Sequence, residues 1–509
     1  MIMIDAIDYR LDKSMPKLGW IAVADADGSE LRVLHGEFVE IASEWLVEGV
    51  WDGRFKEGNF HKTDIFFGSG IRKDGDKIYF VTSTAKTDRI LFCRDRDRFF
   101  ASNSLLLLLS CTGASLDPNH DYVDEAISVT MDGLSKYKRE FRVVHPSIQH
   151  FFQIYHENVV LEKGEVVFEP KIRNRPTFGS FDDYYQSLMN KLLKIRDNYQ
   201  SSGRKWPMAA YSTISSGYDA AAVSCLVRKL GVGECFIGKP LDGLIFERRA
   251  EPGERIARKL GCQVHFLDSK RSHISKEELY FLAGNYPKFS KSVWSEIALH
   301  SMAKSIQKRN TPAAVFMGYS GDDVWGPKGK IDPETGDLLA TPPLSGSNLS
   351  EIRLLIGFLT IPPAYMYIKD VAQIRKISNS REMDPWRLNN DYDRPIPRRI
   401  VEESGIPREW FGMKKHHITT TYFWPINREN RLAFYQSIKT SMNIGKWYVM
   451  AYYLQRKILA STLGMKIYFG KNIDFYDMMR KWATNVLIKK YSVLLGKSFQ
   501  AIKLFKTDQ

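Results

Sequence analysis

A chain of 509 residues with 44% hydrophobic and 26% charged residues can form two domains with complete cores, which excludes a largely disordered protein. Its formal net charge of +14 raises the question of an anionic partner, although Lys and Arg are scattered along the chain and a solvated basic surface explains them equally well. The five cysteines include no Cys-x-x-Cys pair, which argues against a disulfide framework or a zinc ribbon and favours a reducing cytoplasm.

No targeting or membrane-spanning segment is expected. Residues 1–5 lack a basic region followed by an apolar core, so no secretory signal is predicted. The apolar run 105–109 is too short to span a bilayer, and the run 354–368 is interrupted by Pro362 and Pro363.

The first part of the chain, residues 1–175, reads as a series of short strands and turns, including a hairpin over residues 158–168 with a Lys-Gly turn. A linker follows around residues 173–179. Ser180-x-x-Asp183 then has the pattern of a capped helix start. We therefore place a second domain over residues 180–509, where strands and helices alternate up to residue 317, as they do in a parallel sheet covered by helices.

Residues 207–231 predict a strand, a tight loop and a helix that ends at Gly231. The hydroxyl- and glycine-rich loop around Ser215 and Gly217 would present backbone N–H groups at a helix start, which suits a polyphosphate. Asp219 in the first helical turn could hold the Mg²⁺ that accompanies a nucleotide. Taken alone, the same pattern is also ordinary helix capping.

A second apolar strand, residues 313–317, runs into another glycine-rich loop that begins at Gly318 and contains Asp322. Two such loops at the ends of buried strands could place Asp219 and Asp322 on either side of one triphosphate.

These loops resemble those of a known family. Residues 215–220, Ser-Ser-Gly-Tyr-Asp-Ala, resemble the Ser-Gly-Gly-x-Asp-Ser pyrophosphatase loop of the asparagine synthetase family, and residues 318–326 are similar to its Gly-x-Gly-x-Asp-Glu segment. Further similar segments follow in the family's order: 235–238, 253–261, 263–267, 394–398 and Lys414-Lys415.

The resemblance implies an α/β fold class with two parts. Residues 1–175 would form a β-rich sandwich like that of the N-terminal nucleophile (Ntn) hydrolases. Residues 180–509 would form a parallel-sheet, HUP-like ATP-pyrophosphatase domain with a helical C-terminal part.

The resemblance also implies ATP and Mg²⁺ as cofactors. Members of the family adenylate a carboxylate, release pyrophosphate and let an amine attack the acyl-adenylate. Asp219 and Asp322 would hold Mg²⁺, and the implied ATP- and pyrophosphate-binding positions are Ser215, Ser216, Gly217, Tyr218, Asp219 and Gly318. Ser216 replaces a family glycine and Ala220 a family serine, which predicts weaker ATP binding.

The catalytic positions implied for amide formation are Tyr319, Glu351 and Lys414 or Lys415. Tyr319 stands where asparagine synthetases have glutamate and β-lactam and carbapenam synthetases have tyrosine. A tyrosine with a pKa near ~10 is a poor base at neutral pH, so it would need a carboxylate partner such as Glu351. Each position also has a structural alternative. Tyr319 could be a buried aromatic residue, Glu351 a helix cap, and the Lys414-Lys415 pair part of a solvated basic turn.

Glutamine hydrolysis is not expected, because Ile2 occupies the position where glutamine-dependent members have a cysteine. The N-terminal domain would then be degenerate.

We therefore predict a cytoplasmic, AMP-forming C–N ligase that joins a small-molecule or peptide carboxylate to an amine as a lactam or substituted amide. Ammonia- or amine-dependent amidation of a carboxylated sugar or peptide, and an inactive nucleotide-binding scaffold, remain alternatives. A nucleic-acid partner is not expected, because the sequence contains no RNA-binding module. A homodimer is left open.

Residues 479–506 have the pattern of a basic amphipathic helix. It could make peripheral contact with an anionic membrane or dock on its own domain, and docking is the favoured alternative.

Overall fold

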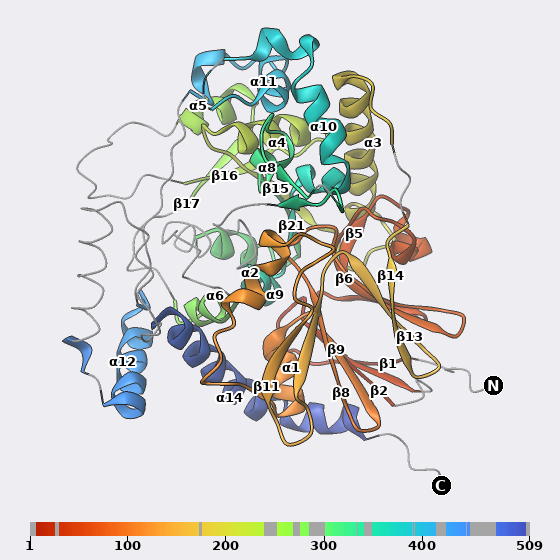
Figure 1. Cartoon of the computed structure of the whole chain (residues 1–509), viewed down its shortest axis with the longest axis vertical. Coiled ribbons are helices and arrows are strands. Elements are labelled where there is room, and N and C mark those ends of the chain that lie inside the picture. Colours follow the sequence, from red (N-terminus) through yellow and green to blue (C-terminus); the bar gives the residue numbers. More distant parts are fainter. Residues whose placement is uncertain are drawn as a thin grey trace.

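The computed structural model describes residues 7–25, 30–172, 176–238, 252–267, 275–284, 301–332, 334–339, 349–388, 390, 392–413, 424–443, 445–447 and 475–504. Within these residues the fold is mixed α/β, with a β-rich N-terminal region and a parallel sheet with helices after it, as predicted (Figure 1).

Two stacked sheets form the N-terminal region. Their facing sides enclose a core that includes Trp20, Ile71, Phe80 and Val159. The eight-stranded sheet has the order β1 (Ile7–Leu11), β3 (Leu31–His35), β2 (Trp20–Asp25), β9 (Arg98–Ser102), β8 (Ile90–Asp95), β12 (His150–Ile154), β11 (Glu140–Val144) and β10 (Ser115–Leu116). The six-stranded sheet has the order β14 (Glu165–Pro170), β13 (Glu157–Glu162), β7 (Lys77–Val81), β6 (Phe66–Asp74), β5 (Trp45–Trp51) and β4 (Glu40–Ala42).

Local sequence signals account for several of these elements. The predicted hairpin is confirmed as β13 and β14, because Lys163 and Gly164 adopt the positive φ angles of 49° and 81° that a tight hairpin turn requires. Ser180 caps α3 (Phe181–Tyr199) by accepting the Asp183 N–H, as the sequence predicts.

The second half contains a five-stranded parallel sheet with the order β17 (Gln263–Leu267), β16 (Glu234–Gly238), β15 (Ala209–Thr213), β18 (Ala313–Phe316) and β21 (Phe358–Ile361). Helix α4 (Tyr218–Arg228) and α5 (Pro252–Lys259) pack into the core on one face of this sheet. Helices α6 (Glu278–Gly284) and α9 (Ser350–Ile356) pack into the core on the other.

Short helices and one hairpin complete the second half after β18. They are α8 (Gly321–Val324), β19 (Lys330–Ile331), β20 (Leu338–Leu339), η4 (Pro363–Asp370), α10 (Val371–Ser378), η5 (Arg381–Trp386), α11 (Pro395–Glu402), η6 (Arg408–Trp410) and α12 (Arg428–Met442). The N-terminal region adds η1 (Phe55–Glu57), η2 (Phe60–Lys62), α1 (Leu105–Thr112) and α2 (Val123–Met131).

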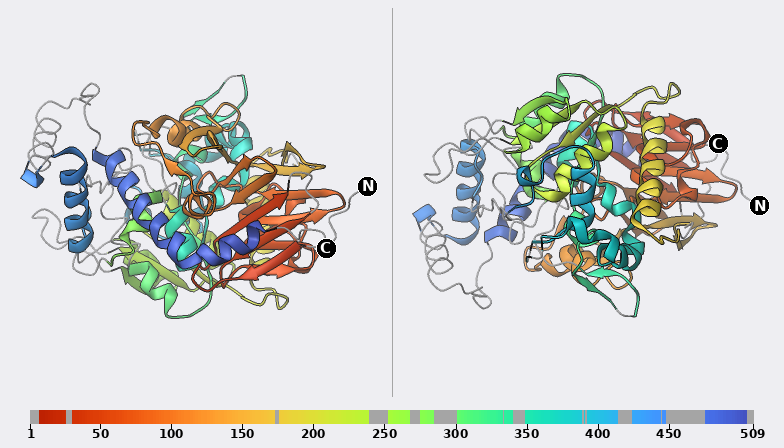
Figure 2. Two further views of the ribbon diagram at one scale, coloured as in Figure 1. Left: turned by 90° about the horizontal axis from the view of Figure 1, so that it is seen from below. Right: turned by 90° about the horizontal axis from the view of Figure 1, so that it is seen from above.

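The basic tail helix, α14 (Phe475–Lys503), is docked on the protein, in agreement with the favoured alternative. Its buried stripe recurs every three or four residues and shares a core with α1 and α6: Met479, Ala483, Leu487, Tyr491, Leu495, Phe499 and Ile502. Figure 2 shows the long helix, in dark blue, lying along the body of the protein. Polar contacts add to this docking, because Ser498 donates to Asp12 (2.7 Å) and Lys481 donates to the carbonyl oxygen of His120 (2.7 Å). No helix in the described part of the chain is both long and apolar enough to cross a bilayer.

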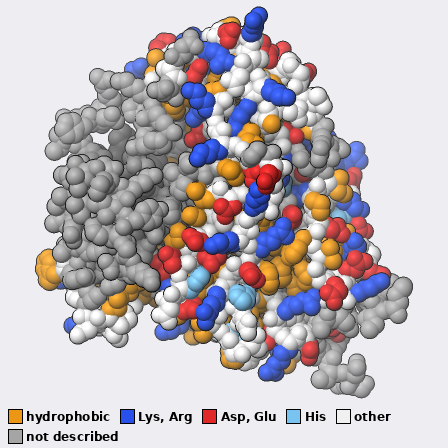
Figure 3. Space-filling view, in the orientation of Figure 1, with side chains coloured by type: hydrophobic (Ala, Val, Ile, Leu, Met, Phe, Trp, Pro, Cys, Tyr) orange, Lys and Arg blue, Asp and Glu red, His pale blue; other side chains and the backbone are white. Residues whose placement is uncertain are grey.

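A buried ion network joins the two halves. Arg353 in α9 donates to both carboxylate oxygens of Glu48 on β5, at 2.9 and 3.0 Å, and also to Asp88. All three side chains are almost completely buried. On the face shown in Figure 3, by contrast, Lys and Arg side chains are interspersed with Asp and Glu side chains.

Candidate active site

The strand order of the parallel sheet identifies where a ligand would bind. From β15 the chain moves outward to β16 and β17, whereas β18 and β21 lie on the opposite side of β15. In open parallel sheets, ligands bind at the point where the strand order reverses, outside the carboxyl ends of the strands. Here that point lies between β15 and β18. The two predicted glycine-rich loops leave these two strands, the first over residues 214–217 and the second over residues 317–320.

The two loops are in direct contact. A Cβ atom built on Gly318 would lie 2.6 Å from the backbone nitrogen of Ala220, and one built on Gly321 would lie 2.5 Å from Oδ1 of Asp219. Glycine is therefore required at both positions, because any side chain would push the second loop away from the start of α4. The two glycine-rich loops thus meet at one place, outside the carboxyl ends of β15 and β18, and we call this place the crevice because ligands of open parallel sheets bind in a crevice there.

Both predicted metal-binding carboxylates border this crevice. Asp219 lies in the first turn of α4 and Asp322 in the first turn of α8, and both are half-buried. Tyr392 lies within electrostatic reach of both: burial, together with the negative charges of Asp219 and Asp322, raises the pKa of Tyr392 to about 12. The structure therefore brings the two aspartates to one place.

The first loop presents the start of α4 to the crevice. Ser215 Oγ accepts the Gly217 N–H at 3.2 Å, and the carbonyl oxygen of Ser216 accepts the Gly412 N–H at 2.9 Å. Ser215, Ser216 and Gly217 are all partly exposed, so they are accessible to a ligand. With eleven residues, α4 has the aligned peptide dipoles that favour an anion at its N-terminus.

The side chain of Tyr218, by contrast, is buried and is not accessible to a ligand in the crevice. It is 1% exposed, its ring lies 5.0 Å from that of Tyr392, and its hydroxyl accepts a hydrogen bond from Arg398. Only its backbone remains to contact a nucleotide at this predicted position.

Tyr319 follows Gly318 in the second loop and packs against the core on the α6 and α9 side of the sheet. Burial raises the pKa of Tyr319 to about 12, so its phenol is neutral at physiological pH. Its hydroxyl makes no hydrogen bond within the described ranges.

Glu351 lies at the interface between the halves. Its carboxylate accepts hydrogen bonds from Ser104 Oγ (2.7 Å) and the Leu105 N–H (2.8 Å), at the start of α1. Burial raises the pKa of Glu351, while these bonds lower it. The carboxylate is thus directed to the N-terminal region and not to the Tyr319 hydroxyl. Lys414 and Lys415 lie outside the described residues.

Two basic side chains border the crevice without having been identified as site residues from the sequence. Arg394 lies against Gly326, which follows α8. A Cβ built on Gly326 would lie 2.6 Å from the guanidinium group of Arg394. Lys86, from the N-terminal region, is 6% exposed and interacts electrostatically with Asp323. The segment 394–398 gave a weak signal for Arg394, whereas a single lysine between two strands gave none for Lys86.

Asp323 is the third acidic residue at the crevice, beside Asp219 and Asp322. Burial and the neighbouring charge of Asp322 raise the pKa of Asp323 to about 6, whereas Lys86 and Arg394 oppose this shift. Ser320, which precedes α8 with a φ of 54°, donates to the Tyr365 hydroxyl at 3.1 Å. Glycine adopts this left-handed conformation with less strain than serine does.

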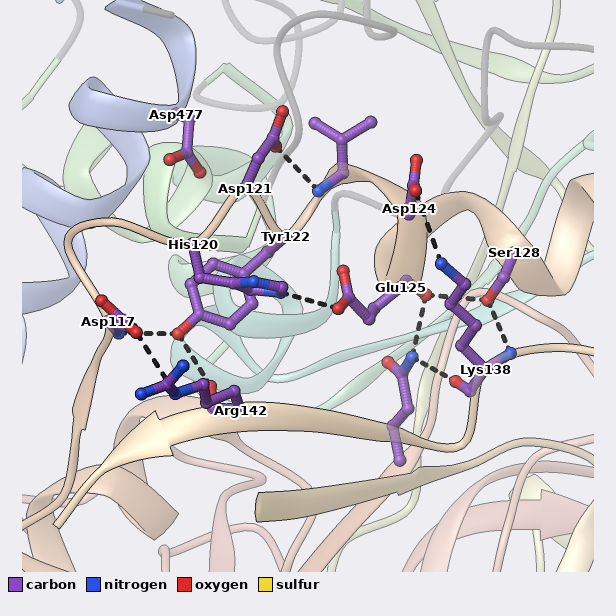
Figure 4. Close-up of polar contacts among 12 residues, drawn as sticks. Asp117, His120, Asp121, Tyr122, Asp124, Glu125, Ser128, Lys138, Arg142 and Asp477 are labelled. Atoms are coloured by element: carbon purple, nitrogen blue, oxygen red, sulfur yellow. Dashed lines mark hydrogen bonds and ion pairs between the residues drawn. The ribbon is translucent and has the colours of Figure 1, made fainter. Parts of the chain in front are cut away.

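A second concentration of acidic and histidine side chains surrounds α2 (Figure 4). His120 pairs with Glu125 at 2.7 Å, and the Tyr122 hydroxyl accepts the Asp117 N–H and donates to the carbonyl oxygen of Arg142. These contacts fix the chain around α2. Among the residues that the structure describes, no group of three or more His, Cys, Asp or Glu side chains is arranged to hold a metal, so Mg²⁺ in the crevice would also need oxygen ligands from phosphates.

Comparison with known proteins adds no family: no protein-family model matches the chain, and no curated protein matches it.

Proposed function

We propose that the protein is an ATP-dependent, AMP-forming amide or lactam synthetase whose nucleotide lies in the crevice between β15 and β18. The observation that carries this proposal is the contact between the two glycine-rich loops at the strand-order reversal, which brings Asp219 and Asp322 to one place. Bound MgATP would supply the adenylyl group that activates a carboxylate.

The residues fit a magnesium-bound phosphate chain in charge and in shape. Backbone N–H groups at the start of α4 can donate to phosphate oxygens, and Asp219 and Asp322 provide the hard oxygen ligands that Mg²⁺ prefers. The glycines at positions 318 and 321 let the second loop approach the start of α4 and the Asp219 side chain closely. Arg394 can supply positive charge from the side of Gly326.

We assign Tyr319 the role of a hydrogen-bond donor in the amide-forming step. Because burial raises its pKa to about 12, it keeps its proton at neutral pH and can stabilise a developing oxyanion more readily than it can accept a proton. The base would then be another group, and Lys414 and Lys415 remain the candidates from the sequence. Glu351 would support the site by holding α1 against α9.

The test is a trapping assay in which hydroxylamine replaces the unknown amine and a panel of carboxylic acids is offered with MgATP. At least one acid should give its hydroxamate together with equimolar AMP. Asp322→Asn should abolish the product, while the exposed-site variant Asp124→Asn should retain it. Release of ADP in place of AMP would contradict the proposal.

A further inference from the structure

Lys86 lies on a loop of the N-terminal region that is held in place by contacts with both halves of the molecule. Between β7 and β8, Thr82 donates to the carbonyl oxygen of Glu157 (2.8 Å), and Thr84 accepts the Phe66 N–H (2.8 Å). Asp88, two residues after Lys86, joins the buried network of Arg353. The position of the Lys86 backbone is therefore set independently of the crevice.

The side chain of Lys86 is directed toward the other half. It interacts electrostatically with Asp323, beside the second loop, and with Asp337, the residue directly before β20. Asp337 is already paired with Lys369 (2.6 Å) and accepts the Ser135 N–H (2.6 Å). Asp323 shares the crevice with Asp322.

The Lys86 ammonium makes neither an ion pair nor a hydrogen bond with any described residue, although the residue is 94% buried, that is, 6% exposed. An ammonium on a residue that is only 6% exposed is poorly solvated, and no hydrogen bond to the described part of the protein offsets this loss. Such a group is expected to gain its partner when an anion binds. Three carboxylates, those of Asp219, Asp322 and Asp323, lie at the crevice. Because they would repel a phosphate chain bound there, the chain needs cations on more than one side.

We infer that Lys86 binds the phosphate chain of the nucleotide, so that the N-terminal region completes the nucleotide site. Arg394 would approach the chain from the side of Gly326, and Lys86 would approach it from the side of Asp323. This inference rests on the function proposed above. It gives the N-terminal region a direct part in ligand binding.

The alternative is a structural role, in which Lys86 only balances the charge of Asp323 across the interface. The two roles predict opposite results for Lys86→Met, which keeps the length and removes the charge. A phosphate-binding lysine should leave the free protein equally or more stable when it is replaced, because an unpaired buried charge is lost. A structural cation should leave the protein less stable and its ligand affinity unchanged.

The experiment is calorimetric titration of the full chain with magnesium pyrophosphate and with MgATP. For Lys86→Met we expect at least a tenfold weaker affinity for both, with a melting temperature at or above that of the wild type. Lys171→Met is the matched control, because Lys171 is also a buried lysine of the N-terminal region but interacts with Asn158 and Phe66 instead of the crevice. Its affinities should equal those of the wild type.

The outcomes separate this inference from the proposed function. If the wild type binds neither ligand, the proposed function fails and the inference falls with it. If the wild type binds and Lys86→Met binds within twofold of it, the inference alone is overturned.

A second measurement applies even if Lys86→Met does not fold. In wild-type protein, saturating magnesium pyrophosphate should slow the acetylation of Lys86 by acetic anhydride, measured by mass spectrometry, without slowing that of Lys171. An unchanged Lys86 rate at saturation would overturn the inference.

Discussion

At the scale of single residues, the crevice depends on the absence of side chains at its glycines. Gly318→Ala would place a methyl group 2.6 Å from the Ala220 nitrogen, so the second loop must move away from α4. We expect this change to cost about 1–3 kcal/mol of stability and to weaken MgATP binding at least tenfold. Gly233→Ala is the matched control, because its added Cβ meets no atom within 4 Å. Calorimetry and denaturant unfolding measure both effects, and equal behaviour of the two variants would contradict the loop contact.

The second prediction at the residue scale concerns the buried Lys171 and the pH dependence of stability. Burial lowers the pKa of Lys171 from 10.5 to about 7, so between these values the unfolded chain binds a proton that the folded protein does not. Stability should therefore rise with pH across this window, by up to about 1.4 kcal/mol for each pH unit. Lys171→Met removes this dependence, so its stability gain over wild type should be largest near pH 7 and should vanish toward pH 10.

Denaturant unfolding at pH 7 and pH 9.5 checks this sign. Lys194→Met, at an exposed position of α3, should show no pH-dependent difference from wild type. A Lys171→Met gain that grows with pH would show that the lysine is charged and stabilising.

At the scale of elements, α14 is held by its apolar stripe. Leu487 is 1% exposed, whereas Val493 on the same helix is 83% exposed. Leu487→Ala should cost about 2–5 kcal/mol of stability, and Val493→Ala should change it by less than about 0.5 kcal/mol. Denaturant unfolding measures both. Equal small effects would mean that the helix is not docked in solution and would reopen the membrane alternative.

Elements with strong local signals could be predicted from the sequence. The β13–β14 hairpin, the Ser180 cap and the strand predicted at residues 313–317, which the structure has as Ala313–Phe316, all follow from short-range chemistry. The sequence predicts that Asp219 and Asp322 could lie on either side of one triphosphate, but it does not predict the direct contact of the two loops. That contact depends on the strand order, which puts β15 beside β18.

Residues whose roles depend on long-range packing could not be predicted in the same way. Glu351 has the sequence pattern of a helix-start carboxylate, but its bonds go to Ser104 and Leu105, almost 250 positions away in the chain. Lys86 belongs to the same class, because its neighbours Asp323 and Asp337 come from the other half of the molecule. Neither relation produces a local pattern that sequence reasoning could detect.

At the scale of the whole molecule, the two halves are joined through Arg353. Replacing it with Met would leave Glu48 and Asp88 as uncompensated buried carboxylates, and we expect a loss of about 3–5 kcal/mol. Arg258→Met is the control, because its pair with Glu254 is largely exposed and contributes little. Thermal unfolding should show one cooperative transition in wild type and a lowered or split transition in Arg353→Met. An unshifted transition would contradict the role of this network.

The central claim, a nucleotide site built from both glycine-rich loops, is tested most directly by calorimetric titration of MgATP into wild type, Asp219→Ala and Asp322→Ala. Wild type should bind, and each variant should bind at least tenfold more weakly, a loss of about 1.4 kcal/mol or more. Asp124→Ala, which changes an exposed carboxylate in α2, should bind as wild type does. Binding by wild type that survives both loop substitutions, or no binding at millimolar MgATP, would contradict the account.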